Sequence, residues 1–290
     1  MIRVAGPSAT VRDEVGEHEA RLPTGRGRER LVAGDRVIVR TRGDELLVEG
    51  LEPRTTVLER ADGHSRRSRP LVANADLAIV MTSVVDPPLR PDIVDRYLVA
   101  AAVGGLEAAI AITKVDLEHD RAVFDEVCAT YRRIGHSVIA GDARSREFVE
   151  ATRELIGGRV AALVGPSGVG KSTLAAALTG VERAVGEVSQ KAGTGRHTTT
   201  DPRLLPLPDG GAIVDTAGVR TFHLPALDVR SVEAGFPDVA AAAERCRFRG
   251  CNHVGEDGCA VPGVVSPDRL ESYRRILEEV GALTRRAPHA

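Results

Sequence analysis

The chain has 290 residues, enough for about two domains, and its 39 Lys and Arg nearly balance its 41 Asp and Glu. A formal charge of −2 excludes a wholesale polycation and a highly charged disordered tail. Aromatic residues make up 3% of the chain and Trp is missing, so we expect no base-stacking surface for single-stranded nucleic acid.

Residues 1–68 are predicted to form short strands separated by turns. Polar and apolar residues alternate over Gly34–Arg40, and a second strand pattern, Glu45–Glu49, follows the turn signal Gly43–Asp44. A segment built from such strands predicts a small N-terminal β-barrel.

Residues 69–225 alternate short apolar runs with helical patterns. The helical segments include Asp92–Val103 and Arg121–Arg133, whose apolar residues recur on one face. The predicted strands are Leu77–Met81, Ala109–Thr113, Val138–Ala140, Val160–Val164 and Ala212–Val214. This alternation predicts an α/β domain with a parallel sheet covered on both faces.

Residues 226–290 change character again. An Ala-rich helical segment precedes a Cys/His cluster, and a final helix is predicted to begin with Ser266 as N-cap and Pro267 as its first residue. We therefore expect a third, helical domain around the cluster.

The chain carries none of the usual membrane signals. Glu107 interrupts the longest apolar stretch, Leu98–Thr113, and the first ten residues lack the pattern of a signal peptide. Four cysteines are too few for a disulfide framework. We expect a cytoplasmic monomer with no membrane partner.

Gly165–Ser172 matches the phosphate-loop pattern G-x-x-x-x-G-K-[ST], between an apolar strand and a helical segment. Backbone N–H groups of such a loop converge on phosphate oxygens, assisted by the helix N-terminus. Lys171 would reach the β- and γ-phosphates, and Ser172 would ligate Mg²⁺. The candidate nucleotide-binding residues here are Gly165, Pro166, Ser167, Gly168, Val169, Gly170, Lys171, Ser172 and Thr173.

A second phosphate-end motif, D-x-x-G, spans Asp215–Gly218 at the end of a predicted strand. Asp215 would hold Mg²⁺ through a water, and the Gly218 N–H would bond the γ-phosphate. This motif alone is weak evidence for a nucleotide site, but it is strong evidence when it follows a phosphate loop.

Thr113–Asp116 is similar to the guanine-reading motif N-K-x-D, with Thr in place of Asn. An ionised Asp116 accepts both the N1–H and the exocyclic amine of guanine, whereas adenine would leave this carboxylate unpaired. Lys114 would lie along the base. Thr113, Lys114 and Asp116 therefore predict a guanine nucleotide as ligand.

The loop Gly195–Thr200 lies between these phosphate-end motifs. A Thr from it should complete the Mg²⁺ shell, and we favour Thr199 over its two Thr neighbours. Val219 follows D-x-x-G and cannot orient water, so His197 is a candidate catalytic residue beside Lys171; the alternative is a solvated loop histidine.

Cys246-x₄-Cys251-x-His253-x₅-Cys259 gathers three cysteines and one histidine in a short segment. Three thiolates and one imidazole form a closed, tetrahedral, structural zinc set, with no open position for catalysis. We expect one zinc ion per chain.

The guanine motif precedes the phosphate loop, which is the reverse of the order in ordinary small GTPases. Together with the Cys₃His spacing, this order resembles the RsgA family of ribosome-dependent GTPases, as do Leu71–Asp76, Asp95–Leu98 and Cys246–His253. The resemblance implies an N-terminal OB-fold, a circularly permuted GTPase domain and a zinc domain. It also implies GTP hydrolysis to GDP stimulated by the small ribosomal subunit, contact with its rRNA, and a role in its late maturation.

Two other functions compete with an RNA-binding GTPase. The first is a P-loop ATPase or small-molecule kinase with a structural zinc site, against which Asp116 argues. The second is a non-enzymatic RNA-binding module, against which intact Lys171, Ser172 and Asp215 argue.

Overall fold

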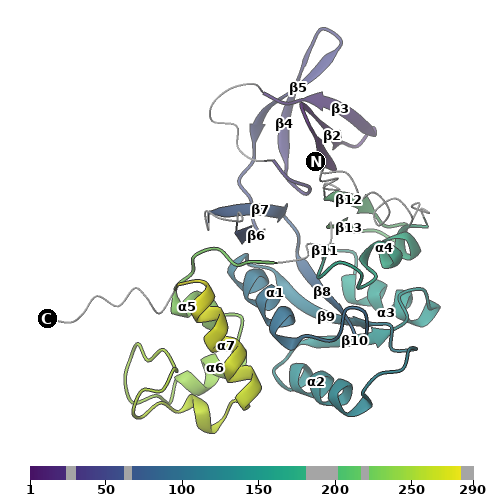
Figure 1. Ribbon diagram of the computed structural model, residues 1–290. Coiled ribbons are helices and arrows are strands. Elements are labelled where there is room, and N and C mark those ends of the chain that lie inside the picture. Colours follow the sequence, from purple (N-terminus) through teal and green to yellow (C-terminus); the bar gives the residue numbers. More distant parts are fainter. Residues whose placement is uncertain (24–30, 62–66, 181–201, 217–221, 282–290) are drawn as a thin grey trace, which may run out of the picture.

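The computed structural model describes residues 1–23, 31–61, 67–180, 202–216 and 222–281. Figure 1 shows three parts: an N-terminal sheet, a central α/β unit and a group of C-terminal helices beside it. Among the described helices, none is both long and apolar enough to span a membrane.

The N-terminal part is a five-stranded sheet of order β1-β2-β3-β5-β4, in which only β3 and β5 run parallel. Its small core consists of Ala9, Val11, Ala20, Leu22 and Val48. An antiparallel ribbon, β6–β7, then leads into the central unit. The strands are β1 (Arg3–Ala5), β2 (Ser8–Arg12), β3 (Glu17–Arg21), β4 (Val37–Arg42), β5 (Glu45–Leu51), β6 (Val57–Ala61) and β7 (Ser68–Ala73).

The central unit contains a six-stranded sheet of order β10-β9-β8-β11-β13-β12, parallel except for the edge strand β12. The predicted strands are confirmed. They are β8 (Leu77–Ser83), β9 (Glu107–Thr113), β10 (Ser137–Gly141), β11 (Val160–Val164) and β13 (Ala212–Asp215); β12 (Arg203–Pro206) was not predicted.

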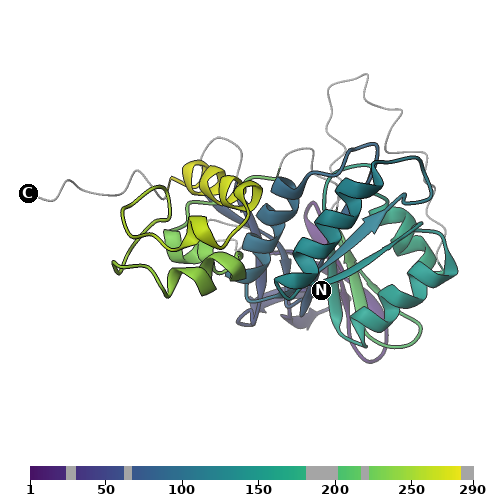
Figure 2. The same cartoon turned by 90° about the horizontal axis from the view of Figure 1, so that it is seen from below.

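Helices cover both faces of this sheet (Figure 2). Side chains of α1 (Pro91–Val103) and α2 (Arg121–Arg133) pack on one face, and those of α3 (Arg146–Ile156) and α4 (Lys171–Thr179) pack on the other. Asp120 caps α2 by accepting hydrogen bonds from the backbone N–H groups of Ala122 and Val123. The parallel, doubly covered sheet is therefore as predicted.

The C-terminal helices are α5 (Val229–Glu233), α6 (Pro237–Ala243) and α7 (Pro267–Glu279). Ser266 and Pro267 begin α7 as predicted. The apolar residues of these helices belong to the same buried cluster as α1 and α2. Gly235 lies so close to α1 that a Cβ there would be 2.5 Å from the Cα of Val99. The helices therefore share the core of the central unit.

Candidate functional site

The predicted site residues meet at one edge of the central sheet. The parallel strands β8, β9, β11 and β13 all end there, and β11 lies between β8 and β13. The phosphate loop follows β11, Asp215 ends β13 and Thr113 ends β9. Ligands of open α/β sheets bind outside the carboxyl ends of the strands, where the strand order reverses.

Glycines allow the phosphate loop to lie close against β8. Gly165 has φ 141°, and a Cβ there would lie 2.1 Å from the carbonyl oxygen of Met81. Gly170, with φ 91°, is the N-cap of α4. Larger side chains at these two positions would clash or be strained. Glycine is therefore required for this loop conformation, which in phosphate loops lets the backbone N–H groups bind an anion.

Lys171 is buried at the start of α4, with 5% of its surface exposed. Its Nζ donates hydrogen bonds to the carbonyl oxygens of Gly165 (2.9 Å) and Pro166 (2.5 Å), so the ammonium lies inside its own loop. Burial lowers the pKa of Lys171 to about 8, and the nearby charge of Asp215 opposes this shift. An anionic phosphate at this loop would favour the charged form.

Ser172 and Asp215 come together although they are far apart in sequence. The Ser172 hydroxyl donates to Asp215 Oδ2 at 3.4 Å, and Asp215 is 4% exposed. The Thr216 hydroxyl donates to the carbonyl oxygen of Leu163 at 2.6 Å, which fixes the end of β13 against β11. A carboxylate beside a hydroxyl fits the oxygen ligands that Mg²⁺ prefers.

The guanine motif is tied to the phosphate loop by its first residue. Thr113 is fully buried, and its hydroxyl lies within hydrogen-bond distance of the carbonyl oxygens of Val169 (2.8 Å) and Thr82 (3.1 Å), between which it shares its one proton. Lys114 has φ 61° and donates from Nζ to the carbonyl oxygen of Asp86. Asp116 is exposed. Thr113 thus holds the loop in place, while the Asp116 carboxylate is accessible to a base.

A loop that sequence reasoning missed adjoins the same place. Residues 142–145 follow β10, and Ala143 is buried beside the phosphate loop, 3.4 Å from the position of a Cβ on Gly170. Ser145 caps α3 by accepting from the backbone N–H of Phe148 at 3.2 Å. The predicted strand Val138–Ala140, followed by polar residues, was the signal that could have identified this loop.

A cavity of about 360 Å³ adjoins the phosphate loop. Its walls include Pro166 and Ser167 of the loop, Thr82 of β8, and Arg90 and Ile93 at the start of α1. The cavity therefore reaches from the phosphate loop to the N-terminus of α1. The remaining predicted residues, His197, Thr199 and Gly218, lie outside the described residues.

The Cys₃His cluster forms a compact group. One ligand atom from each of Cys246, Cys251, His253 and Cys259 lies within 4.8 Å of the others. The sulfurs of Cys246 and Cys259 are 3.9 Å apart, and Nδ1 of His253 lies 3.6 and 3.4 Å from them. Tetrahedral bonds of about 2.3 Å to sulfur and about 2.1 Å to nitrogen require separations of about 3.8 and 3.6 Å. The group therefore fits a zinc ion.

A carboxylate stabilises the loop that carries two of these ligands. Glu256 accepts hydrogen bonds from the backbone N–H groups of Asn252 and Val254, both at 2.9 Å. Although partial burial raises the pKa of Glu256, these hydrogen bonds lower it to about 2. The loop between Cys251 and Cys259 thus keeps its shape through an ionised side chain.

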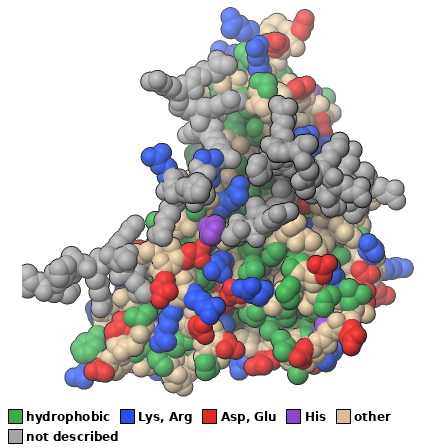
Figure 3. Space-filling view, in the orientation of Figure 1, with side chains coloured by type: hydrophobic (Ala, Val, Ile, Leu, Met, Phe, Trp, Pro, Cys, Tyr) green, Lys and Arg blue, Asp and Glu red, His purple; other side chains and the backbone are tan. Residues whose placement is uncertain are grey.

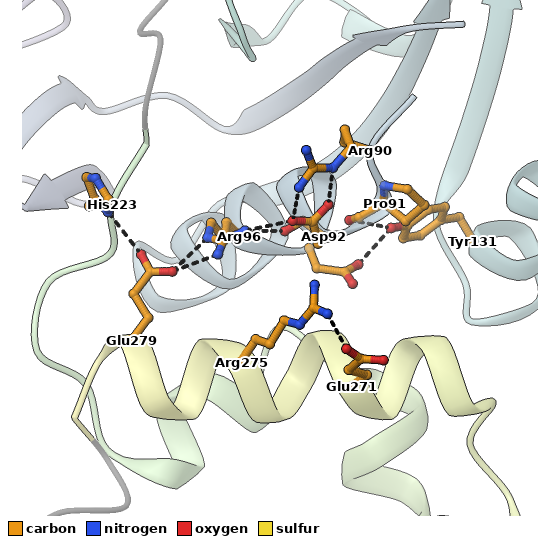
Figure 4. Close-up of polar contacts among 10 residues, drawn as sticks. Arg90, Pro91, Asp92, Arg96, Tyr131, His223, Glu271, Arg275 and Glu279 are labelled. Atoms are coloured by element: carbon orange, nitrogen blue, oxygen red, sulfur yellow. Dashed lines mark hydrogen bonds and ion pairs between the residues drawn. The ribbon is translucent and has the colours of Figure 1, made fainter. Parts of the chain in front are cut away.

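Charged side chains join the C-terminal helices to α1 (Figure 4). Arg90 donates two hydrogen bonds of 2.9 Å to the Asp92 carboxylate, and Asp92 also pairs with Arg96 at 3.3 Å. Arg96 reaches Glu279 of α7 at 2.8 Å, and Glu279 lies 3.4 Å from His223. Acidic and basic side chains are interspersed over this face of the molecule (Figure 3). The chain of ion pairs runs from the cavity to the segment after Asp215.

A buried ion pair lies beneath this surface chain. Arg269 of α7 pairs with Asp95 of α1, which is fully buried, and with Asp238 at 2.9 Å. Tyr131 donates to Asp95 at 2.7 Å, and the guanidinium of Arg269 lies 4.4 Å from the centre of the Phe236 ring. Burial raises the pKa of Asp95, against the opposing effect of Arg269. Asp95 and Arg269 therefore neutralise each other only while α1 and α7 stay in contact.

Comparisons with known proteins agree with this geometry. A sequence model of the RsgA GTPase family matches residues 51–225. The "Small ribosomal subunit biogenesis GTPase RsgA 1" of Vibrio parahaemolyticus is 38% identical, with 95% of this chain and 81% of that protein covered. The "Small ribosomal subunit biogenesis GTPase RsgA" of Haemophilus influenzae (strain 86-028NP) is 35% identical, with 86% and 75% covered.

Solved structures share the fold. The crystal structure of YjeQ from Thermotoga maritima superimposes with a TM-score of 0.73 at 26% identity, covering 98% of both chains. YloQ, described as a circularly permuted GTPase, gives a TM-score of 0.70 at 24% identity, covering 99% of this chain and 95% of YloQ. With the guanine motif ahead of the phosphate loop and both at one sheet edge, the chain belongs to the RsgA GTPase family.

Proposed function

We propose that this chain hydrolyses GTP to GDP and phosphate at the carboxyl edge of its central sheet, and that it acts on the small ribosomal subunit during biogenesis. The observation that carries the proposal is the meeting of Lys171, Ser172 and Asp215 at the ends of β11 and β13. The names of the relatives support the small subunit as the partner, and contact with its rRNA is part of the proposal.

The proposed roles follow from the chemistry of each group. The loop N–H groups and the Lys171 ammonium neutralise the β- and γ-phosphates, and Asp116 reads the guanine edge while Thr113 steadies the loop. Mg²⁺, when bound, would neutralise phosphate charge; Ser172, Thr199 and Asp215 are its proposed ligands. His197 is proposed to orient the attacking water, and the Gly218 N–H to bond the γ-phosphate.

The Cys₃His group is proposed to hold one structural zinc ion. Its separations match tetrahedral zinc, and its four protein ligands fill the coordination shell. We also propose three functional domains, an OB-fold at 1–68, the permuted GTPase at 69–225 and the zinc domain at 226–290.

The test is phosphate release from GTP with and without purified small ribosomal subunits. We expect the subunits to stimulate the wild-type chain, and Lys171→Ala to abolish turnover in both conditions. Arg133→Ala, which removes a positive charge from the exposed end of α2, is the matched control and should behave as wild type. Undiminished turnover of Lys171→Ala, or no stimulation of the wild type, would contradict the proposal.

A further inference from the structure

The two ring nitrogens of His253 face different partners. Nδ1 lies 3.4 and 3.6 Å from the sulfurs of Cys259 and Cys246, whereas Nε2 lies 3.1 Å from Oε1 of Glu233. The histidine is 1% exposed, and the Glu233 side chain is 19% exposed. The ring is therefore held between the ligand group and a carboxylate that is not part of it.

Glu233 comes from outside the segment that carries the four ligands. It is the last residue of α5, whose N-cap Asp228 accepts a hydrogen bond from the backbone N–H of Ser231 at 2.8 Å. Val232 is fully buried, and Gly235 lies directly against the backbone of Val99 in α1. The carboxylate thus has a fixed position relative to the central α/β unit.

The chemistry of imidazole gives this contact a direction. If Nδ1 supplies the lone pair to a metal ion, the ring proton is on Nε2. Nε2 is then a hydrogen-bond donor and needs an acceptor beside it. A carboxylate in that place fixes the tautomer and the ring orientation, and it makes the imidazole a stronger donor to the metal.

We propose that Glu233 is a positioning residue of the metal centre, orienting His253 through Nε2 and linking the Cys₃His group to α5 and α1. The inference rests on the proposed zinc site. The inference adds a fifth residue on which the affinity for the metal depends, and this residue lies on α5, outside the segment that carries the four ligands.

The experiment compares the full-length wild type with Glu233→Gln, Glu233→Ala and the control Asp228→Ala. Asp228→Ala weakens the same helix by removing its N-cap but leaves the Glu233 side chain intact. For each protein, zinc content, zinc affinity by competition with a chelator, and the visible absorption of the Co²⁺-substituted form are measured.

We expect Glu233→Ala to lower zinc affinity by about 10- to 100-fold and to shift the Co²⁺ absorption bands. Glu233→Gln should lose less, because its amide oxygen still accepts the Nε2 proton. Asp228→Ala should leave the bands unchanged. Wild-type bands and affinity in both Glu233 variants would overturn the inference, as would a loss in Glu233→Ala that Asp228→Ala reproduces without any shift of the bands. Wild-type protein without zinc would instead refute the zinc site itself.

Discussion

The two regions that flank the central α/β unit are attached to it in different ways. The N-terminal sheet has a small core of its own and meets the unit largely through backbone contacts, such as the bond of 3.0 Å from the Leu204 N–H to the carbonyl oxygen of Ile2. Of its described residues, only Ala33, between β3 and β4, belongs to the central cluster. The C-terminal helices have no such separation, because their apolar side chains join those of α1 in one cluster and Arg269 crosses the boundary.

This difference predicts two kinds of coupling. A region with its own core can unfold locally while the nucleotide site remains folded. When a region that shares a core unfolds, it exposes and destabilises part of the central unit as well. The C-terminal helices should therefore contribute to the stability of the nucleotide-binding unit, and the N-terminal sheet should contribute little to it.

The largest expected effect is that of Arg269→Ala. The substitution leaves Asp95 buried without its cation, so the free energy of unfolding should fall by about 3–5 kcal/mol. This loss of stability is measured by denaturant unfolding, with nucleotide binding as the probe of the folded state. Arg275→Ala on the same helix, which breaks an exposed pair with Glu271, should cost less than about 1 kcal/mol. Equal effects of the two substitutions would contradict a shared core.

Asp35→Ala tests the N-terminal region in the same manner. Asp35 is fully buried and accepts from Arg54 at 2.7 and 2.9 Å and from the backbone N–H of Val32 at 2.8 Å. We expect a local cost of about 2–3 kcal/mol, seen as faster hydrogen exchange in β1–β5. GTP affinity should stay within about twofold of wild type. Loss of nucleotide binding would show that this region is as integrated as the C-terminal helices.

The pH dependence of GTP affinity sharpens the comparison. Since the pKa of Lys171 is about 8 and bound phosphates would raise it, binding takes up a proton only above about pH 8, where the free side chain has lost it. Affinity should be constant below about pH 8 and then fall, approaching tenfold per pH unit. Titration calorimetry should give the same profile for Asp35→Ala. Lys171→Arg, whose guanidinium stays charged, should bind more weakly with a flat profile; a flat wild-type profile would refute this role of Lys171.

The smallest expected effect concerns the surface ion pairs. Glu279→Gln removes the carboxylate that pairs with Arg96 and His223. Because these side chains are partly exposed to solvent, the free energy of unfolding should fall by about 0.5–1 kcal/mol. A double-mutant cycle with Arg96→Gln isolates the coupling between α1 and α7. A coupling as large as the loss in Arg269→Ala would mean that the surface chain, rather than the buried pair, joins the helices.

Much of the fold was predictable because its signals are local. Apolar runs identified five strands of the central sheet, and Ser266 with Pro267 marked the start of α7. The edge strand β12 was missed because three of its residues are only partly buried, the fourth is exposed, and the four carry little periodicity. The shared core of the C-terminal helices was also missed, since it depends on contacts between residues far apart in sequence.

The same limit applies to the site. The phosphate loop and the metal ligands have fixed spacings, so their residues could be named in advance. Ala143 and Glu233 have no such spacing, and only folding brings them to Gly170 and His253. Thr113 was assigned from its motif, but its bond to the Val169 carbonyl could not be foreseen from the sequence.

The central claim is that a guanine nucleotide binds at the edge where Thr113, the phosphate loop and Asp215 meet. The most direct test is a competition measurement of GTP, ATP and xanthosine triphosphate binding to wild type and Asp116→Asn. Wild type should prefer GTP by about 100-fold or more, because Asp116 accepts both guanine donors. Asp116→Asn should transfer the preference to the xanthine nucleotide, whose 2-oxygen accepts where guanine donates. Equal binding of ATP and GTP by wild type, or an unchanged preference for GTP in Asp116→Asn, would contradict this account.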